Sequence, residues 1–113
     1  MQHDDKTILC RSSHGSLSAF NNAVAYELRF GQITVMLDSE KVHHLSNKLK
    51  DTSSLDWVYT TQQKFVFVHF PQLQGHYMLG ENEVHDLRQL LLEASAMIKV
   101  HHRLYFKYTP RIN

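Results

Sequence analysis

The chain has 113 residues, of which 42% are hydrophobic and 20% charged, and its twelve Lys and Arg nearly balance its eleven Asp and Glu. This length predicts a single domain over residues 1–113, and the composition excludes a disordered chain. The small net charge excludes a general attraction to nucleic acid or membranes, no apolar run reaches the ~20 residues of a membrane helix, and the lone Cys10 excludes an intrachain disulfide.

The first elements of the chain are predicted to be strands. Residues 7–12 and 16–20 are two short candidates. In residues 25–38, AYELRFGQITVMLD, apolar and polar positions alternate on both sides of Gly31-Gln32, which predicts two strands that each bury one face. Glycine suits the first position of a two-residue turn, where a positive φ is required, so the two strands should form a hairpin.

A helix is predicted to follow this hairpin. Asp38 or Ser39 can cap it by accepting a hydrogen bond from an early backbone N–H, and Glu40 suits the positive end of a helix. The segment DTSS, residues 51–54, should end the helix. Its apolar face is predicted to consist of Val42, Leu45 and Leu49.

The second half of the chain predicts the same order of elements. Residues 57–61 are a candidate strand, and residues 64–70, KFVFVHF, have the apolar composition of a central strand that is buried on both faces. Residues 76–79 should form the strand that returns beside it.

A second, longer helix is predicted to end the chain. Asn82 is its predicted cap, and it should end by about Tyr108, because Pro110 disfavours helical geometry at the preceding residue. Its apolar stripe is predicted to consist of Val84, Leu87, Leu91, Ala94 and Ile98, widened by Leu90 and Met97.

Two segments resemble each other in sequence: MLDSEKVHHL, from Met36, and MLGENEVHDL, from Met78, at an offset of 42 residues. We interpret the match as a fold unit used twice, because the shared Val and Leu residues are those predicted to pack. This predicts an α+β fold in which an antiparallel sheet has two helices on one face and consists of two quasi-repeated strand–strand–helix units. Residues 33–49 and 75–91 should then superpose within one sheet.

Histidine is unusually frequent, with nine copies scattered along the chain. The repeat places His43 and His85 at equivalent helical positions, each about 100° from a residue of the apolar stripe. We therefore expect both to be mostly exposed to solvent and to bind no metal.

The spacing Cys10-x-x-x-His14 is the first candidate for a metal site, since zinc binds thiolate and imidazole ligands. A structural zinc site needs four ligands and a catalytic one usually three, so we favour a buried cysteine that packs as a small hydrophobic residue. Ser12, Ser13 and Ser16 surround the histidine, and we interpret them as turn residues rather than as a nucleophile beside a base. The sequence contains no recognisable catalytic motif, so no catalytic residue, metal or cofactor is expected.

The last fifteen residues, KVHHRLYFKYTPRIN, combine basic and aromatic residues and contain no acidic one. Such a surface can bind single-stranded nucleic acid through phosphate contacts and stacking. Cations also suit the negative end of a helix, and aromatic residues pack, and we favour this second interpretation. The candidate basic-aromatic surface consists of Lys99, Arg103, Phe106, Lys107 and Arg111.

The second helix is predicted to overhang its own domain. About 26 residues span ~39 Å, whereas a compact domain of this size spans about 34 Å. Aromatic residues in the overhang continue the apolar stripe, and exposed aromatic stripes usually mark an interface. We therefore predict a two-fold homodimer whose interface consists of Ile98, His101, Tyr105 and Tyr108. The alternative is a break near Val100, after which residues 103–108 fold back on their own domain.

One stretch resembles small bacterial families of unknown function: alternating apolar positions around a Phe-Gly turn, followed by a capped helix, in Tyr26-x-Leu28-x-Phe30-Gly31-x-Ile33-x-Val35-x-Leu37-x-Ser39. Members of these families are single α+β domains, and the resemblance covers residues 20–50, with a weaker similarity in 76–98. Some members carry more cysteines before the hairpin, where this chain has only Cys10 and His14. The resemblance implies a fold type and a bacterial origin, and it implies no activity.

Two classes of function are compatible with the sequence. The first is a small cytosolic interaction or regulatory module, homodimeric and with an unidentified ligand. The second is an enzyme or metal-dependent protein that uses histidines together with Cys10. The lack of a recognisable catalytic constellation favours the first class. The start of the chain lacks the basic and apolar regions of a signal peptide, which, with a single cysteine, predicts a cytoplasmic location.

Overall fold

The computed structural model of the chain describes residues 6–20, 25–70 and 73–108, the last eight of these by their backbone alone. The first group of elements comprises β1 (Lys6–Arg11), β2 (Gly15–Phe20), β3 (Tyr26–Phe30), β4 (Ile33–Leu37) and the helix α1 (Ser39–Leu49). After a short 3-10 helix, η1 (Thr52–Ser54), the second group comprises β5 (Val58–Tyr59), β6 (Lys64–Val68), β7 (Tyr77–Gly80) and the helix α2 (Glu81–Tyr108).

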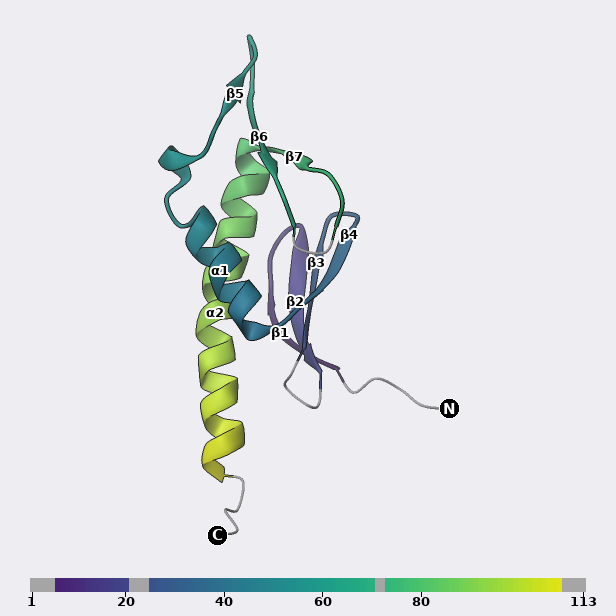
Figure 1. The fold of residues 1–113 in the computed structure, drawn as a ribbon, viewed down its shortest axis with the longest axis vertical. Helices are drawn as coiled ribbons and strands as arrows, with labels where there is room; N and C mark the ends of the chain where they lie inside the picture. The colour runs from purple at the N-terminus through teal and green to yellow at the C-terminus, as the bar shows by residue number, and fades with distance from the viewer. Residues whose placement is uncertain (1–5, 21–24, 71–72, 109–113) are drawn as a thin grey trace.

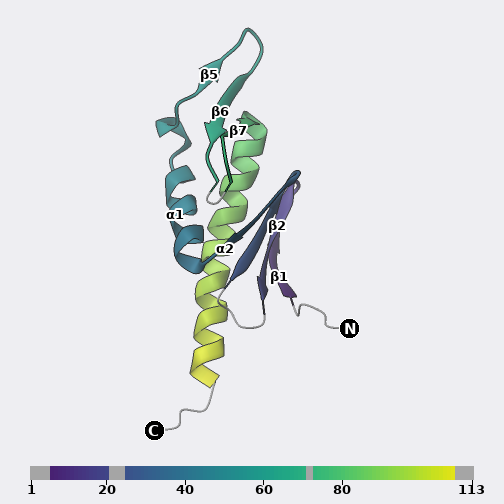
Figure 2. The ribbon, with the colours of Figure 1, turned by 45° about the vertical axis from the view of Figure 1, so that its right-hand side comes forward.

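The strands form two antiparallel sheets, which confirms the α+β class. β1 to β4 form a four-stranded sheet in chain order, and β5 to β7 form a three-stranded one. α2 packs on the four-stranded sheet and α1 packs on α2, so both helices lie on the same side of that sheet (Figure 1, Figure 2). The expectation of one sheet is wrong, because the β5–β7 sheet packs at the N-terminal end of α2 and does not pair with β4.

The order strand–strand–helix occurs in both halves of the chain, as β3–β4–α1 and as β6–β7–α2. The matched Val and Leu residues of the two helices are buried, namely Val42 and Val84, Leu45 and Leu87, and Leu49 and Leu91, whereas the matched Met36 and Met78 are exposed. Because the two units lie in different sheets, their predicted placement in one sheet is wrong, and their superposition stays a prediction.

The predicted hairpin and the first helix cap are confirmed. Phe30 lies opposite Ile33, and Gly31 in the turn between them has a φ of 59°, in the left-handed region that glycine favours. Asp38 caps α1, because its Oδ1 accepts a hydrogen bond of 2.8 Å from the backbone N–H of Lys41.

The predicted cap of the second helix is wrong. α2 begins at Glu81, so Asn82 lies inside its first turn. The residue before the helix is Gly80, whose N–H donates to Oε1 of Glu83 at 2.8 Å. This is the returning hydrogen bond of a capping box, and it satisfies one of the N–H groups that a helix start leaves unpaired.

Most of the predicted core is confirmed. The stripe of α2 is buried from Val84 to Ile98, with Leu90 included, and α2 continues as a helix to Tyr108 as expected. Met97 does not join the stripe, since it is 38% exposed. β6 is central in its sheet, but only one of its faces is buried: Phe67 is 54% exposed, because no described element covers the outer face of the β5–β7 sheet.

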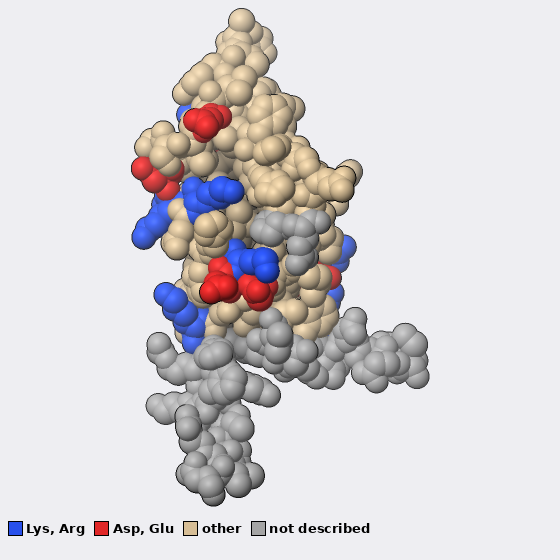
Figure 3. Space-filling model, in the orientation of Figure 1, with Lys and Arg blue, Asp and Glu red and all other residues tan. Residues whose placement is uncertain are grey.

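Charges are mixed over the described surface. On the face drawn in Figure 3, acidic and basic side chains lie beside one another, so this face carries no large field of one sign among the described residues. Among the helices that the structure describes, none combines the length and the apolar character that crossing a membrane would require.

Candidate functional site

A pocket of about 480 Å³ lies between the turn of the β3–β4 hairpin and the strand β7, and we call it the inter-sheet pocket. Its volume is within the range of small-ligand sites. Apolar and polar side chains share its walls, which belong to both sheets, to the β1–β2 turn and to α2. The lining residues are His14, Phe30, Gly31, Gln32, Ile33, Thr34, Leu73, Tyr77, Met78, Leu79 and Glu83.

One carboxylate on α2 holds the β1–β2 turn in place beside this pocket. Oδ2 of Asp86 accepts hydrogen bonds from Oγ of Ser12 at 2.7 Å and from the backbone N–H of His14 at 3.0 Å. Oδ1 accepts from the backbone N–H of Ser13 at 3.3 Å. The turn and α2 are 72 or more residues apart in sequence, so this cluster is a tertiary contact.

The same carboxylate orients the histidine ring in the pocket wall. Nδ1 of His14 lies 3.1 Å from Oδ2 of Asp86, and the ring stacks at an angle on Phe30, with centroids 5.7 Å apart. An ionised carboxylate only accepts hydrogen bonds, so Nδ1 is the donor, and Nε2 bonds to none of the described residues.

Asp86 is held in its ionised form. Its burial opposes ionisation, but the hydrogen bonds from Ser12, His14 and Ser13 outweigh this effect and lower the pKa of the Asp86 carboxyl below its ordinary value. The turn is therefore anchored most strongly above the acid range.

The two metal candidates from the sequence are not brought together. Sγ of Cys10 donates a weak hydrogen bond of 3.7 Å to the carbonyl of Leu90, whereas His14 bonds to Asp86, one turn earlier on α2. Burial, reinforced by the negative charge of Glu93, raises the pKa of the Cys10 thiol to about 11. The thiol stays protonated near neutrality, and the protonated form is neither a good metal ligand nor a nucleophile.

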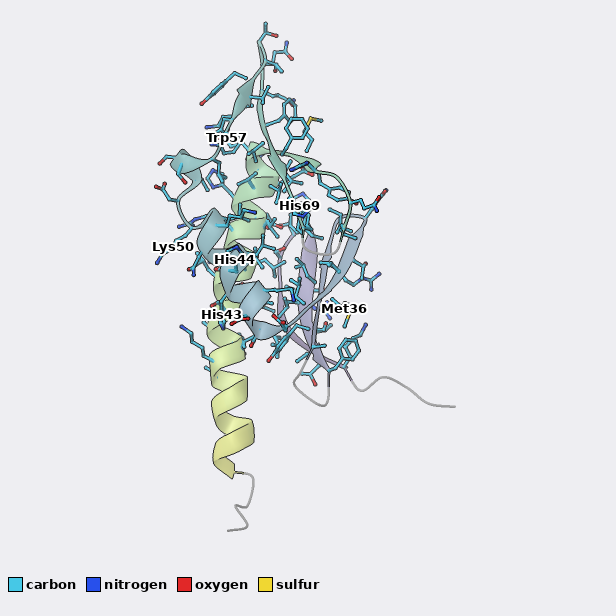
Figure 4. The ribbon with its side chains drawn as sticks, viewed as in Figure 1. Met36, His43, His44, Lys50, Trp57 and His69 are labelled. Atoms are coloured by element: carbon cyan, nitrogen blue, oxygen red, sulfur yellow. The ribbon has the colours of Figure 1, made fainter. Side chains whose placement is uncertain are left out.

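The expectation for the two repeated histidines is wrong for one of them. His43 is half-buried, and its Nδ1 pairs with Oγ of Ser95 on α2. The reason is that α1 packs on α2, which covers the side of α1 that carries His43. Figure 4 labels His43 on α1. His85 is exposed, with its Nε2 4.0 Å from Oε2 of Glu81. Among the residues that the structure describes, no three potential ligand side chains gather as a metal site would require.

The candidate interface begins at a residue that is already covered. Ile98 is 2% exposed and belongs to the core of its own chain, so it offers no surface to a partner. Lys99 is exposed. The side chains at positions 101–108 lie outside the described residues, and with them His101, Arg103, Tyr105, Phe106, Lys107 and Tyr108, as does the whole of Arg111.

The sequence indicated the turn but not its anchor. Reading Ser12 and Ser13 as turn residues fits their hydrogen bonds, which fix the backbone. Its position marks Asp86 only as one of the acids near the start of a helix, where a negative charge is stabilising. The signal available in the sequence is the short polar run SSHG, which offers several donors and lacks a local acidic acceptor.

A protein-family model matches residues 1–110 of the chain. No curated protein and no solved structure matches it.

Proposed function

The chain belongs to this family, the family of unknown function DUF6686, and we propose that it is a small cytoplasmic interaction module that binds its ligand in the inter-sheet pocket. The observation that carries this proposal is the pocket itself, about 480 Å³ in volume, in which apolar and polar side chains share the walls. Such a combination is typical of ligand sites, where polar groups orient the ligand and apolar walls supply affinity.

The polar groups at the pocket support binding rather than catalysis. A catalytic serine needs a hydrogen bond to a base, but Oγ of Ser12 donates to Asp86 and accepts from the N–H of Gly15 at 3.2 Å. Oε1 of Glu83 is committed to the N–H of Gly80. These groups hold the backbone, which favours a preformed binding site over a hydrolytic one.

The alternative, an enzyme or metal-dependent protein that uses histidines with Cys10, has less support. The raised pKa keeps the Cys10 thiol neutral near pH 7, and the thiol bonds to Leu90, away from His14. His14 lines the pocket and has no activated nucleophile beside it, but its Nε2 can still contact a ligand.

Fragment binding followed by NMR tests the pocket. We expect aromatic carboxylic acids and amines of low molecular mass to shift the backbone amides of Gly31, Thr34 and Leu79. Leu73→Trp should fill the pocket and weaken their binding at least about tenfold, which is ~1.4 kcal/mol. The matched control is Leu55→Trp, at another half-buried leucine outside the pocket, which should leave binding unchanged. Fragments that bind elsewhere, or that tolerate Leu73→Trp, would contradict the proposal.

The length of α2 supports the homodimer. α2 has 28 residues, and Ile98 is the last core residue among its described side chains. Residues 99–108, the α2 extension, add about 15 Å of helix. They project past the end of the four-stranded sheet in both ribbon views (Figure 1, Figure 2). We propose that two copies pair through this extension about a two-fold axis.

Light scattering at high micromolar concentration tests the dimer. Tyr105 continues the helical phase of the buried stripe, so Tyr105→Glu should convert the dimer into a monomer by placing a charge in the interface. Phe106→Glu makes the same kind of change about 100° away and should leave the dimer intact. A full-length monomer, or a dimer that survives removal of the whole α2 extension, would exclude this interface.

A further inference from the structure

β4 is an outer strand of the four-stranded sheet, and among the residues that the structure describes its outer edge carries none of the usual protection. Proteins normally protect an open edge strand against aggregation with bulges, charges or prolines. The other outer strand, β1, has an irregular register between Ile8 and Cys10 and charged residues at its ends. The sequence of β4, ITVML, is uncharged and pairs with β3 without a shift in register.

The register of the hairpin determines which backbone groups of β4 face outward. In a two-residue hairpin the flanking residues, Phe30 and Ile33, exchange hydrogen bonds. Hydrogen-bonded and non-bonded pairs then alternate, so the N–H and C=O groups of Thr34 and Met36 point away from β3. The bond from the Gly31 N–H to the His14 carbonyl, on the β2 side, fits this phase. No described residue pairs with those four groups.

The inter-sheet pocket opens at the start of this same edge. Ile33 and Thr34 line the pocket, together with Phe30 and Leu79. A strand that pairs antiparallel with β4 runs toward the hairpin turn, so its C-terminal end reaches the pocket. Side chains alternate between the two faces of a strand, so every second residue of the added strand lies on the face that carries Ile33.

We propose that the edge of β4 and the inter-sheet pocket form one site for an extended peptide from a partner protein, which adds antiparallel as a fifth strand and places a large apolar side chain in the pocket. Four backbone hydrogen bonds to Thr34 and Met36 hold the peptide, and the pocket selects its side chain. The inference rests on the proposed function of the pocket, and it adds the class of ligand.

A second copy of the chain fits the site less well. Two β4 strands can pair about a two-fold axis at Val35, which brings Leu37 of each opposite Ile33 of the other. In that pairing Ser39, where one chain enters α1, lies beside the hairpin turn of the other copy. An extended residue is needed there to fill the pocket, and a helix does not supply one. A separate extended peptide continues past this point.

Hydrogen exchange with a selected peptide tests the proposal. A displayed library of random linear peptides is selected on the full chain, and the tightest peptide is synthesised. We expect the amides of Thr34 and Met36 to exchange rapidly in the free protein and at least about tenfold more slowly with peptide. The amide of Val35, already bonded to β3, is the internal control and should not change.

The outcomes separate the two proposals. Peptides that shift the pocket amides but leave Thr34 and Met36 unprotected would overturn the added strand and leave the pocket as a binding site. A library that yields no peptide for this site would also overturn the added strand, while fragment binding still reports on the pocket. Protection of Thr34 and Met36 that rises with protein concentration alone would identify a second copy as the occupant.

A proline at the edge tests the backbone bonds directly. Thr34→Pro removes an outward N–H, which an edge strand tolerates, and should abolish peptide binding. Asp56→Ala, at an exposed residue outside β4 and outside the pocket lining, is the control and should bind as the parent does. Circular dichroism shows whether Thr34→Pro folds. If it does not, Leu73→Trp is the second variant, because it blocks the pocket end of the same site. It should reduce the affinity for the peptide at least about tenfold. Full binding by a folded Thr34→Pro would overturn the proposal.

Discussion

Gly15→Ala is expected to lower the free energy of unfolding by about 3 kcal/mol, the upper end of the range for overpacking. A Cβ at Gly15 would lie 2.0 Å from the carbonyl oxygen of Arg29 and 3.0 Å from Cα of Phe30. Both are backbone atoms of β3, the strand that pairs with β2, so no side chain can rotate away. The start of β2 must separate from β3, which breaks ladder hydrogen bonds.

Urea denaturation, followed by the fluorescence of the single Trp57, measures this effect. Gly80→Ala is the matched control, because the nearest atom to its added Cβ is Oε1 of Glu83 at 3.7 Å. It should cost less than about 1 kcal/mol, the usual size of a helix-cap effect. Equal effects at Gly15 and Gly80 would mean that the close approach of β2 and β3 is not what makes Gly15 necessary.

Asp86→Ala is expected to lower the free energy of unfolding by about 2 kcal/mol, since hydrogen bonds to charged groups are worth more than neutral ones. The change removes the acceptor of Ser12, Ser13 and His14 at once and frees the β1–β2 turn from α2. Asp56→Ala, at an exposed aspartate, is the control and should stay within about 0.5 kcal/mol of the parent. A neutral effect of Asp86→Ala would show that the turn keeps its position without the anchor.

The dependence of the free energy of unfolding on pH should show that the ionised form of Asp86 stabilises the fold. Its pKa is lower in the folded chain than in the unfolded one, so the unfolded state binds the proton first as the pH falls. Asp86 therefore contributes its full stabilisation above the ordinary carboxyl pKa of about 4. This contribution is lost as the pH falls through the pKa of Asp86 in the folded chain. Asp86→Asn should make the free energy of unfolding less dependent on pH in this range. Asp38 and Asp51, whose pKa values are also lowered by hydrogen bonds to nearby backbone and side-chain groups, should leave a residual slope.

Much of the local structure followed from neighbouring residues. The turn at Gly31 and the cap at Asp38 were predictable because each depends on contacts within a few residues. The length of α2 was predictable for the same reason, since a helical period and the position of Pro110 determine where a helix can continue. The cap at the start of α2 was also local, and the sequence already contained its partner, Glu83.

The candidate site was not predictable in this way. Asp86 lies more than 70 residues from the turn that it holds, and nothing in its own helix distinguishes it from other acids near a helix start. The pocket needs both sheets in place before its walls exist. His43 had the phase of an exposed residue, and it is half-buried only because α1 packs on α2.

The sequence by itself determined which segments are strands, which are helices, where the main turn lies and which faces are apolar, because propensity, capping and periodicity act over a few residues. Tertiary structure decided that the strands divide into two sheets, that no described strand pairs with the outer edge of β4, and that a pocket lies between that edge and β7. Periodicity says that a face will be buried but not which partner buries it, and that choice depends on how whole helices and sheets pack around one shared core.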